Sequence, residues 1–123
     1  MTQVLVSSEQ LRRIIQTTEH PHYVHFMDPN RYALTFACYN QVDYTKLCIE
    51  SMVNHGLDLS RLVIVDNGST DDTRRYAKTL NLGGCIFNEA NLGCGVAWNQ
   101  GALALQAEWT IIMNNDVLVS KNW

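Results

Sequence analysis

The chain has 123 residues, of which 46% are hydrophobic and 17% are charged, and its formal net charge is -3 at pH 7. This length suits one globular domain and excludes two, and the low charged fraction excludes a disordered chain. The negative charge argues against a nucleic-acid partner, and no apolar run approaches the roughly 20 residues of a membrane span. We therefore expect a soluble, cytoplasmic domain with neither a signal peptide nor a transmembrane segment.

Residues 1–31 form the first predicted unit, a short helix and a linking loop. Leu11, Ile14 and Ile15 fall on one face of a helix predicted over residues 8–19. Prolines at positions 21 and 29 then mark a loop that continues to Arg31. The second unit, residues 32–123, contains no repeat or break in composition, so we treat it as one domain.

The second unit begins with an apolar and aromatic run, Tyr32 to Cys38, that has the length of a strand. Asp43 can cap a helix that continues to about His55. This helix is predicted to face the core with Tyr44, Leu47, Cys48 and Met52.

The rest of the chain continues the alternation. The run from Arg61 to Asp66 is typical of a strand buried on both faces of a parallel sheet. Ser69 and Asp72 suggest a capping box for a helix over residues 70–80. Further predicted elements are a strand over residues 85–87, a helix over 96–106 and a strand over 109–113.

Four strands alternating with three helices predict a three-layer α/β fold, an open and mainly parallel sheet with helices on both faces. In such sheets ligands bind beyond the carboxyl ends of the strands. Asp66 and Asp116 each follow an apolar strand, and a carboxylate in that position needs a hydrogen-bonding or metal partner. The strand ends are therefore the candidate site.

Other readings of this pattern fit less well. A dinucleotide site needs G-x-G-x-x-G after the first strand, but the nearest match, at Gly93 and Gly95, follows the third strand and lacks the last glycine. The P-loop string is absent from the sequence. A receiver-like signalling domain fits the length, although its first strand would end in an acidic pair; it remains a structural alternative.

Four strings at the strand ends carry a more specific pattern: residues 35–40 (TFACYN), 63–73 (VIVDNGSTDDT), 91–101 (NLGCGVAWNQG) and 111–117 (IIMNNDV). In this order they resemble the signatures of inverting family 2 glycosyltransferases with the GT-A fold, a Rossmann-like fold that binds nucleotide-diphospho-sugars. The last string resembles the family's metal-binding D-x-D motif in an N-N-D variant. The resemblance covers most of the second unit.

The resemblance implies a role for each matching residue. Asp66 would hydrogen-bond the base, Asn114 would contact ribose or sugar, and Asp116 would hold Mg²⁺ or Mn²⁺, which neutralises the departing diphosphate. The implied nucleotide-sugar-binding residues are Tyr39, Asn40, Asp66, Asn67, Asn91, Gly93, Asn114 and Asn115. The implied donor is a UDP-, dTDP- or GDP-linked sugar, and the acceptor hydroxyl is unspecified.

The sequence departs from the family pattern in two places. Cys38 stands where the family usually has threonine. The family's catalytic base, an Asp or Glu downstream of the metal motif, has no match in the seven residues after Asp116. We therefore expect the nucleotide-binding half of a glycosyltransferase, with no catalytic residue assigned. The alternative is a non-catalytic binding or assembly module, and in either case the exposed sheet edge suggests a homo-oligomer.

Overall fold

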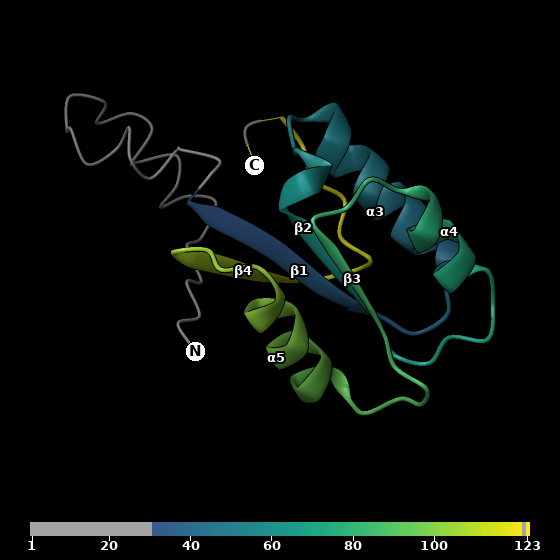
Figure 1. The fold of residues 1–123 in the computed structure, drawn as a ribbon. Helices are drawn as coiled ribbons and strands as arrows, with labels where there is room; N and C mark the ends of the chain where they lie inside the picture. The colour runs from purple at the N-terminus through teal and green to yellow at the C-terminus, as the bar shows by residue number, and fades with distance from the viewer. Residues whose placement is uncertain (1–30, 122) are drawn as a thin grey trace, which may run out of the picture.

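A computed structural model describes residues 31–121 and Trp123 of the chain (Figure 1). The helix predicted over residues 8–19 and most of the loop after it lie outside these residues. The described part contains one sheet of four parallel strands in the order β3-β2-β1-β4. The strands are β1 (Tyr32–Cys38), β2 (Leu62–Asp66), β3 (Gly84–Phe87) and β4 (Trp109–Asn114). All four predicted strands are confirmed to within one residue at each end.

In the described part of the chain, three α-helices cover the sheet: α3 (Val42–Asn54), α4 (Thr73–Thr79) and α5 (Cys94–Ala104). A short 3-10 helix, η1 (Leu59–Arg61), precedes β2. Figure 1 shows α3 and α4 on one face of the sheet and α5 on the other. The predicted three-layer α/β arrangement, with helices on both faces of a parallel sheet, is therefore confirmed.

A hydrophobic core cluster lies between α3 and the sheet. The buried helix positions are Thr45, Cys48, Ile49 and Met52, which follow the spacing of one helical face. Tyr44 and Leu47, predicted to face inward, are instead 57% and 51% exposed. The prediction chose the large apolar side chains, but the helix is rotated so that the smaller Thr45 packs beside Cys38. This rotation leaves Tyr44 beside the carboxyl ends of the strands.

Close packing holds α5 against the opposite face. Gly101 is buried against β1, and a Cβ atom at this position would overlap the side chain of Thr35. The Thr35 side chain is held in this orientation, because its hydroxyl donates a hydrogen bond to the Val63 carbonyl at 2.9 Å. The absence of a side chain at Gly101 therefore sets how closely α5 approaches the sheet.

Two helix starts differ from the prediction. Helix α3 begins at Val42, with Gln41 as its N-cap, so Asp43 lies in the first turn and is not the cap. The capping box of Ser69 and Asp72 does not form: Asp72 is itself the N-cap, and the Ser69 hydroxyl accepts a hydrogen bond from the Asn40 amide. Helix α4 begins at Thr73, three residues later than expected.

All four cysteines lie in the described part of the chain, and all are free thiols. Cys38 and Cys48 are buried, and Cys94 is exposed. Burial raises the pKa of Cys38 to about 12, so this thiol stays protonated at neutral pH. Within the same residues, none of the helices has the length and apolar content to cross a lipid bilayer.

Candidate functional site

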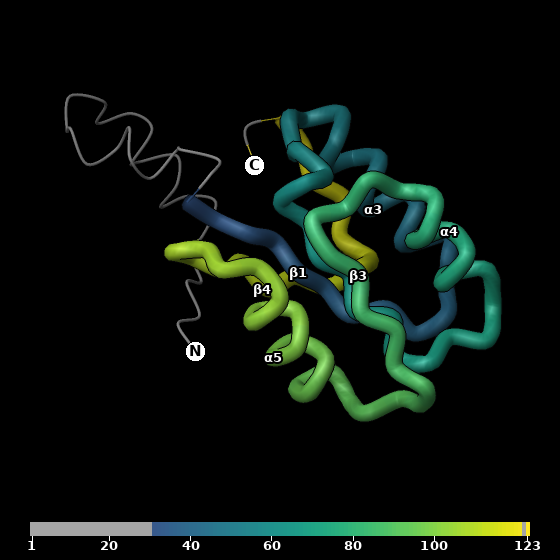
Figure 2. The backbone as a smooth tube through the Cα atoms, in the orientation of Figure 1, coloured from purple at the N-terminus to yellow at the C-terminus, as the bar shows by residue number. Residues whose placement is uncertain are grey.

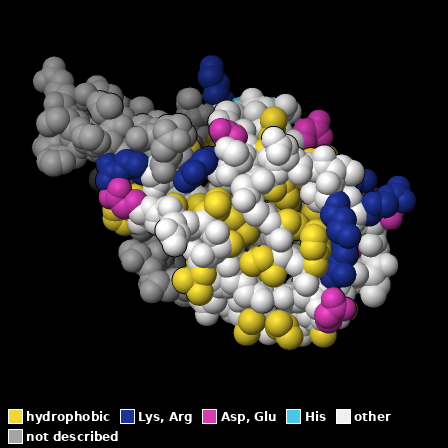
Figure 3. Space-filling view, in the orientation of Figure 1, with side chains coloured by type: hydrophobic (Ala, Val, Ile, Leu, Met, Phe, Trp, Pro, Cys, Tyr) yellow, Lys and Arg dark blue, Asp and Glu magenta, His cyan; other side chains and the backbone are white. Residues whose placement is uncertain are grey.

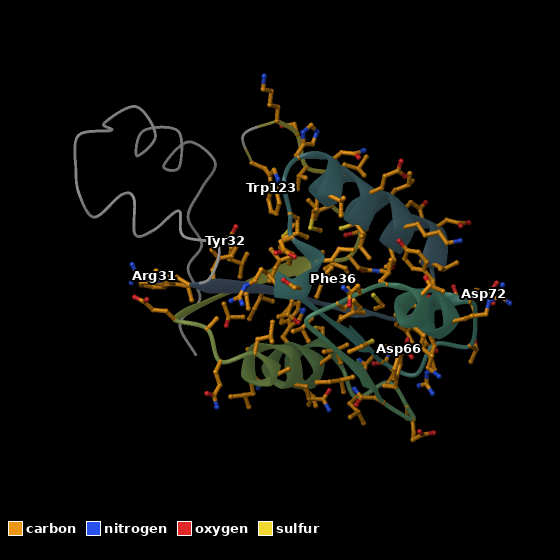
Figure 4. All side chains as sticks on the ribbon, turned by 45° about the horizontal axis from the view of Figure 1, so that its top comes forward. Arg31, Tyr32, Phe36, Asp66, Asp72 and Trp123 are labelled. Atoms are coloured by element: carbon orange, nitrogen blue, oxygen red, sulfur yellow. The ribbon has the colours of Figure 1, made fainter. Side chains whose placement is uncertain are left out.

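The polar strand ends meet at one edge of the sheet. In the strand register Cys38 lies beside Asp66, and Asp66 lies beside Phe87. On the other side of β1, Ala37 lies beside Asn114. Figure 4 shows Asp66 at the end of the sheet opposite to Arg31 and Tyr32, and Figure 2 shows the connections after β1, β2 and β3 leaving from that end. The parallel sheet therefore brings together loops that are far apart in the sequence.

A pocket with a volume of about 340 Å³ opens at this edge. It lies between the β1–α3 connection and the loop after β4, and its lining residues are Tyr39, Gln41, Tyr44, Asn115 and Asp116. Tyr39 is 51% exposed, and Asp116 is also exposed, so their side chains are open to a ligand. Two aromatic rings and one carboxylate thus share a single hollow.

Asn115 is fixed by the core beneath the pocket. Its side-chain nitrogen donates a hydrogen bond to the Thr45 hydroxyl at 3.0 Å, and that hydroxyl donates to the Cys38 sulfur at 3.7 Å. Thr45 and Cys38 are both buried. The rotation of α3 that buries Thr45 therefore also anchors the loop that carries Asp116.

The carboxylate of Asp66 is completely buried. It accepts hydrogen bonds from the Ser69 amide at 3.3 Å and from the Nε atom of Arg74 at 3.0 Å. The Arg74 guanidinium also donates to the Asn88 carbonyl at 2.8 Å and lies 5.0 Å from the centre of the Phe87 ring. In this structure both oxygens of Asp66 are thus engaged by the protein.

Arg74 belongs to a basic group on α4. Figure 3 shows Lys and Arg side chains gathered over this helix. Arg75 pairs with Asp72 at 3.8 Å, and the Lys78 nitrogen lies 5.2 Å from the centre of the Phe87 ring. Two of these cations are thus balanced by nearby carboxylates, because Arg74 pairs with Asp66 and Arg75 pairs with Asp72.

Asn67 connects two loops through one side chain: its own loop after β2 and the loop between β3 and α5. Its nitrogen donates to the Asn91 side-chain oxygen at 2.9 Å and to the Gly93 carbonyl at 3.2 Å. Its oxygen accepts from the Asn88 side chain at 3.1 Å and from the Leu92 amide at 3.0 Å. Asn67 thus holds the loop before α5 in place.

The structure separates the nine sequence-predicted site residues into groups. Tyr39, Asn115 and Asp116 line the pocket. The side chains of Asp66, Asn67 and Asn91 bind other parts of the protein in the adjoining loops. The Asn40 side chain also binds another loop of the protein, and the Gly93 carbonyl accepts a hydrogen bond from Asn67. Asn114 is exposed at the end of β4.

Sequence reasoning missed three residues that shape the site: Gln41, Tyr44 and Arg74. Gln41 and Tyr44 line the pocket, and Arg74 neutralises Asp66. One signal was present for the first two, because Gln41 lies in the connection after a strand end and Tyr44 lies in the first helical turn after it, and both segments border the site in such sheets. Arg74 had no comparable signal, since its partner is set by how α4 packs.

The residues of the pocket can be tested against a divalent ion. Mg²⁺ and Mn²⁺ prefer oxygen ligands, and Asp116 presents an exposed carboxylate on the pocket wall. Among the described residues, no three His, Cys, Asp or Glu side chains lie together as an ion-binding group. The donors therefore fit such an ion only when ligand phosphates and water complete its coordination shell.

Solved structures share this fold. A mannosyltransferase from Pyrobaculum calidifontis, in complex with GDP-Man and Mn²⁺, aligns over 94% of this chain and 35% of that chain, with a TM-score of 0.63 and 21% identity. Residues 1–349 of S. aureus TarS align over 74% of this chain and 29% of that chain, with a TM-score of 0.55 and 24% identity. The same part of TarS has also been solved in complex with UDP. These similarities confirm the predicted GT-A fold class.

Sequence relatives agree with the fold. EpsH of Bacillus subtilis (strain 168), which is named as a glycosyltransferase, is 32% identical over 94 residues, covering 73% of this chain and 27% of its own. RT0329 of Rickettsia typhi (strain ATCC VR-144 / Wilmington) is named as an uncharacterized glycosyltransferase. It is 29% identical over 84 residues, which cover 68% of this chain and 26% of RT0329. This chain thus spans about a quarter of the length of both relatives.

The family profile described as Glycosyl transferase family 2 matches residues 35–123. This match covers all four strings at the strand ends and most of the chain. It decides between the family predicted from those strings and the receiver-like alternative. The chain belongs to glycosyl transferase family 2.

Proposed function

We propose that residues 32–123 bind the nucleotide-sugar donor of a glycosyltransferase, in the pocket at the carboxyl edge of the sheet. The observation that carries this proposal is the lining of one pocket by exposed tyrosines and an exposed carboxylate. A nucleoside diphosphate has an aromatic base at one end and phosphates at the other. The pocket offers a partner for each.

The phosphate end is assigned to Asp116. Two carboxylate oxygens cannot bind a diphosphate directly, because like charges repel, so a divalent ion must lie between them. Mg²⁺ or Mn²⁺ held by Asp116 would neutralise charge on the departing diphosphate. The mannosyltransferase that shares the fold was solved with Mn²⁺, which supports this assignment.

The base end is assigned to the tyrosines. Base stacking on an aromatic ring contributes roughly 1–3 kcal/mol in nucleic-acid complexes. Tyr39 and Tyr44 are both more than half exposed on the pocket wall and are available for stacking. UDP, dTDP and GDP remain the candidate carriers, and the two solved neighbours hold UDP and GDP-Man.

Asp66 as a partner of the base stays a prediction. Its carboxylate is buried and paired with Arg74, so contact with a base requires Arg74 or the Ser69 loop to move. The rest of the proposal concerns the whole protein: inverting transfer of the sugar to an acceptor hydroxyl in one displacement, in the cytoplasm.

Calorimetric titration tests the donor site. The full chain is titrated with UDP, GDP and dTDP, each with and without Mn²⁺. We expect one nucleotide to bind in the presence of Mn²⁺ and Asp116→Asn to weaken it at least about tenfold, the loss of one charge-assisted contact. Glu50→Gln is the matched control, because Glu50 is an exposed carboxylate on α3 outside the pocket lining.

Two outcomes would overturn the proposal. Absence of heat with all three nucleotides removes the donor site and favours a non-catalytic assembly module. Equal weakening of nucleotide binding by Asp116→Asn and Glu50→Gln would contradict the metal assignment.

Self-association through β3 or β4, the edge strands of the described sheet, is a separate proposal. Size-exclusion chromatography would contradict it by showing a monomer at all concentrations.

A further inference from the structure

The connection between β1 and α3 has an unusual backbone conformation. Asn40 and Gln41 have φ angles of 56° and 61°, and they are the only non-glycine residues with positive φ in the described part of the chain. The left-handed region is unfavourable for side chains with a Cβ, although asparagine tolerates it best. Two consecutive residues in this region persist only where surrounding contacts hold them.

The Asn40 side chain supplies the first set of contacts. Its Oδ1 atom accepts hydrogen bonds from the Thr70 amide at 2.7 Å and from the Asp71 amide at 3.2 Å. The Asn40 amide donates in return to the Ser69 hydroxyl at 2.8 Å. Asn40 therefore ties its own turn to the loop that follows β2, about 30 residues further along the chain.

The Asp71 side chain supplies the second set. One carboxylate oxygen accepts from the Val42 amide at 3.0 Å, at the start of α3. The other accepts from the Thr73 amide at 2.9 Å, at the start of α4. Asp71 thus joins the first residues of two helices that lie on the same face of the sheet (Figure 1). Asn40 and Asp71 together form what we call the turn clamp.

The turn clamp holds the segment that builds the pocket wall. Tyr39 precedes the left-handed pair, Gln41 belongs to it and Tyr44 follows it in the first turn of α3. We propose that Asn40 and Asp71 are positioning residues, which set the donor pocket by fixing this turn and do not themselves contact the nucleotide. This inference rests on the proposed function, and it moves Asn40 from the predicted ligand contacts to the supporting structure.

A matched pair of variants at position 40 tests the inference. Asn40→Gly keeps the freedom to adopt positive φ but removes the side-chain acceptor. Asn40→Asp keeps an acceptor oxygen and still tolerates the left-handed conformation. Asp71→Asn keeps one oxygen, so it can serve Val42 or Thr73 but not both. Asn81→Gly, at an exposed position after α4, is the control.

Two measurements are made on each variant. Amide hydrogen exchange of Val42, Thr70 and Asp71 reads the turn clamp without a ligand, and thermal unfolding confirms that each variant folds. Calorimetry with the nucleotide that binds the wild type reads the pocket. For Asn40→Gly we expect exchange at Thr70 to rise about tenfold and nucleotide affinity to fall about tenfold, with largely restored values for Asn40→Asp.

The outcomes separate this inference from the proposed function. If the wild type binds none of the nucleotides, the donor site is wrong, and amide exchange still supports or overturns the turn clamp. Unchanged exchange in both Asn40→Gly and Asp71→Asn would overturn the turn clamp itself. Faster exchange with unchanged nucleotide affinity would overturn the positioning role.

Discussion

The Arg74 guanidinium binds the buried Asp66 carboxylate at 3.0 Å, at the carboxyl end of β2. Asp66 is fully buried, whereas the Arg74 side chain is 32% exposed. Because an isolated carboxylate is costly to bury, this pair determines whether β2 can end in a charge. The pair is therefore a requirement of the fold, as well as a barrier between Asp66 and any base.

Removing the arginine should be more damaging than removing a neighbour of the same charge. We expect Arg74→Met to lower the free energy of unfolding by about 3 kcal/mol, because it leaves a buried charge without its partner. Arg75→Met is the control, since Arg75 pairs with Asp72 at the surface, and we expect it to cost less than about 1 kcal/mol. Urea denaturation measures both. Equal losses would show that Asp66 is stabilised by something other than Arg74.

The contact between Gly101 and Thr35 predicts an asymmetry between two glycines of α5. Gly101→Ala should destabilise the protein by roughly 2 kcal/mol, because the added Cβ overlaps the Thr35 side chain. Gly95→Ala places its Cβ in open space and should be stabilising or neutral, because alanine favours a helix. Thermal unfolding distinguishes the two. A neutral Gly101→Ala variant would mean that α5 packs less closely on β1 than described.

The side-chain nitrogen of Asn67 distinguishes it from an aspartate at the same position. Asn67→Asp removes two donors and brings a charge against the Asn91 side-chain oxygen and the Gly93 carbonyl. We expect a loss of about 2 kcal/mol in unfolding free energy and faster amide exchange at Leu92. Asn81→Asp, at an exposed loop position, controls for the added charge. Unaltered exchange at Leu92 would show that Asn67 does not hold this loop.

Asp71 gives the turn clamp a defined pH dependence. Desolvation raises the pKa of this carboxyl, but hydrogen bonds from Thr73 and from the Val42 amide outweigh it and lower the pKa below its ordinary value of 3.8. A depressed pKa stabilises the folded state above the unfolded pKa, and this contribution is lost as pH falls through the folded pKa. In a pH titration, the Val42 amide resonance should therefore shift with a midpoint below pH 3.8.

Asp71→Asn is the control for this titration and should abolish the shift at Val42. A wild-type midpoint above the ordinary pKa would mean that the hydrogen bonds from Thr73 and Val42 do not outweigh desolvation. In that case the turn clamp would open under milder acid than the structure implies.

Strand positions could be predicted from the sequence because they depend on local composition. The apolar run ending in Asp66 needs burial on both faces, and only a central strand provides it. The face of α3 could not be predicted, because hydrophobicity alone favoured Tyr44 and Leu47 over Thr45. Thr45 is buried because its hydroxyl has partners in Asn115 and Cys38, and these become neighbours only after folding.

The candidate site divides in the same way. The sequence placed Tyr39, Asn115 and Asp116 at strand ends, and the parallel sheet brings them to one pocket. The sequence could not show that the side chains of Asn40 and Asn67 form hydrogen bonds with other loops, because those bonds join segments more than 20 residues apart. Polar residues at a strand end can thus serve the ligand or the loops, and only the folded geometry separates the two roles.

The central claim is that a nucleotide and a divalent ion bind beside Asp116. Mn²⁺ is paramagnetic, so NMR spectra recorded with Mn²⁺ and a nucleoside diphosphate measure its position directly. We expect the amide resonances of Tyr39, Asn115 and Asp116 to broaden, while that of Tyr32, at the opposite end of β1, stays sharp. Asp116→Asn should remove the selective broadening. Broadening that is spread evenly over the protein, or that persists in Asp116→Asn, would contradict the account.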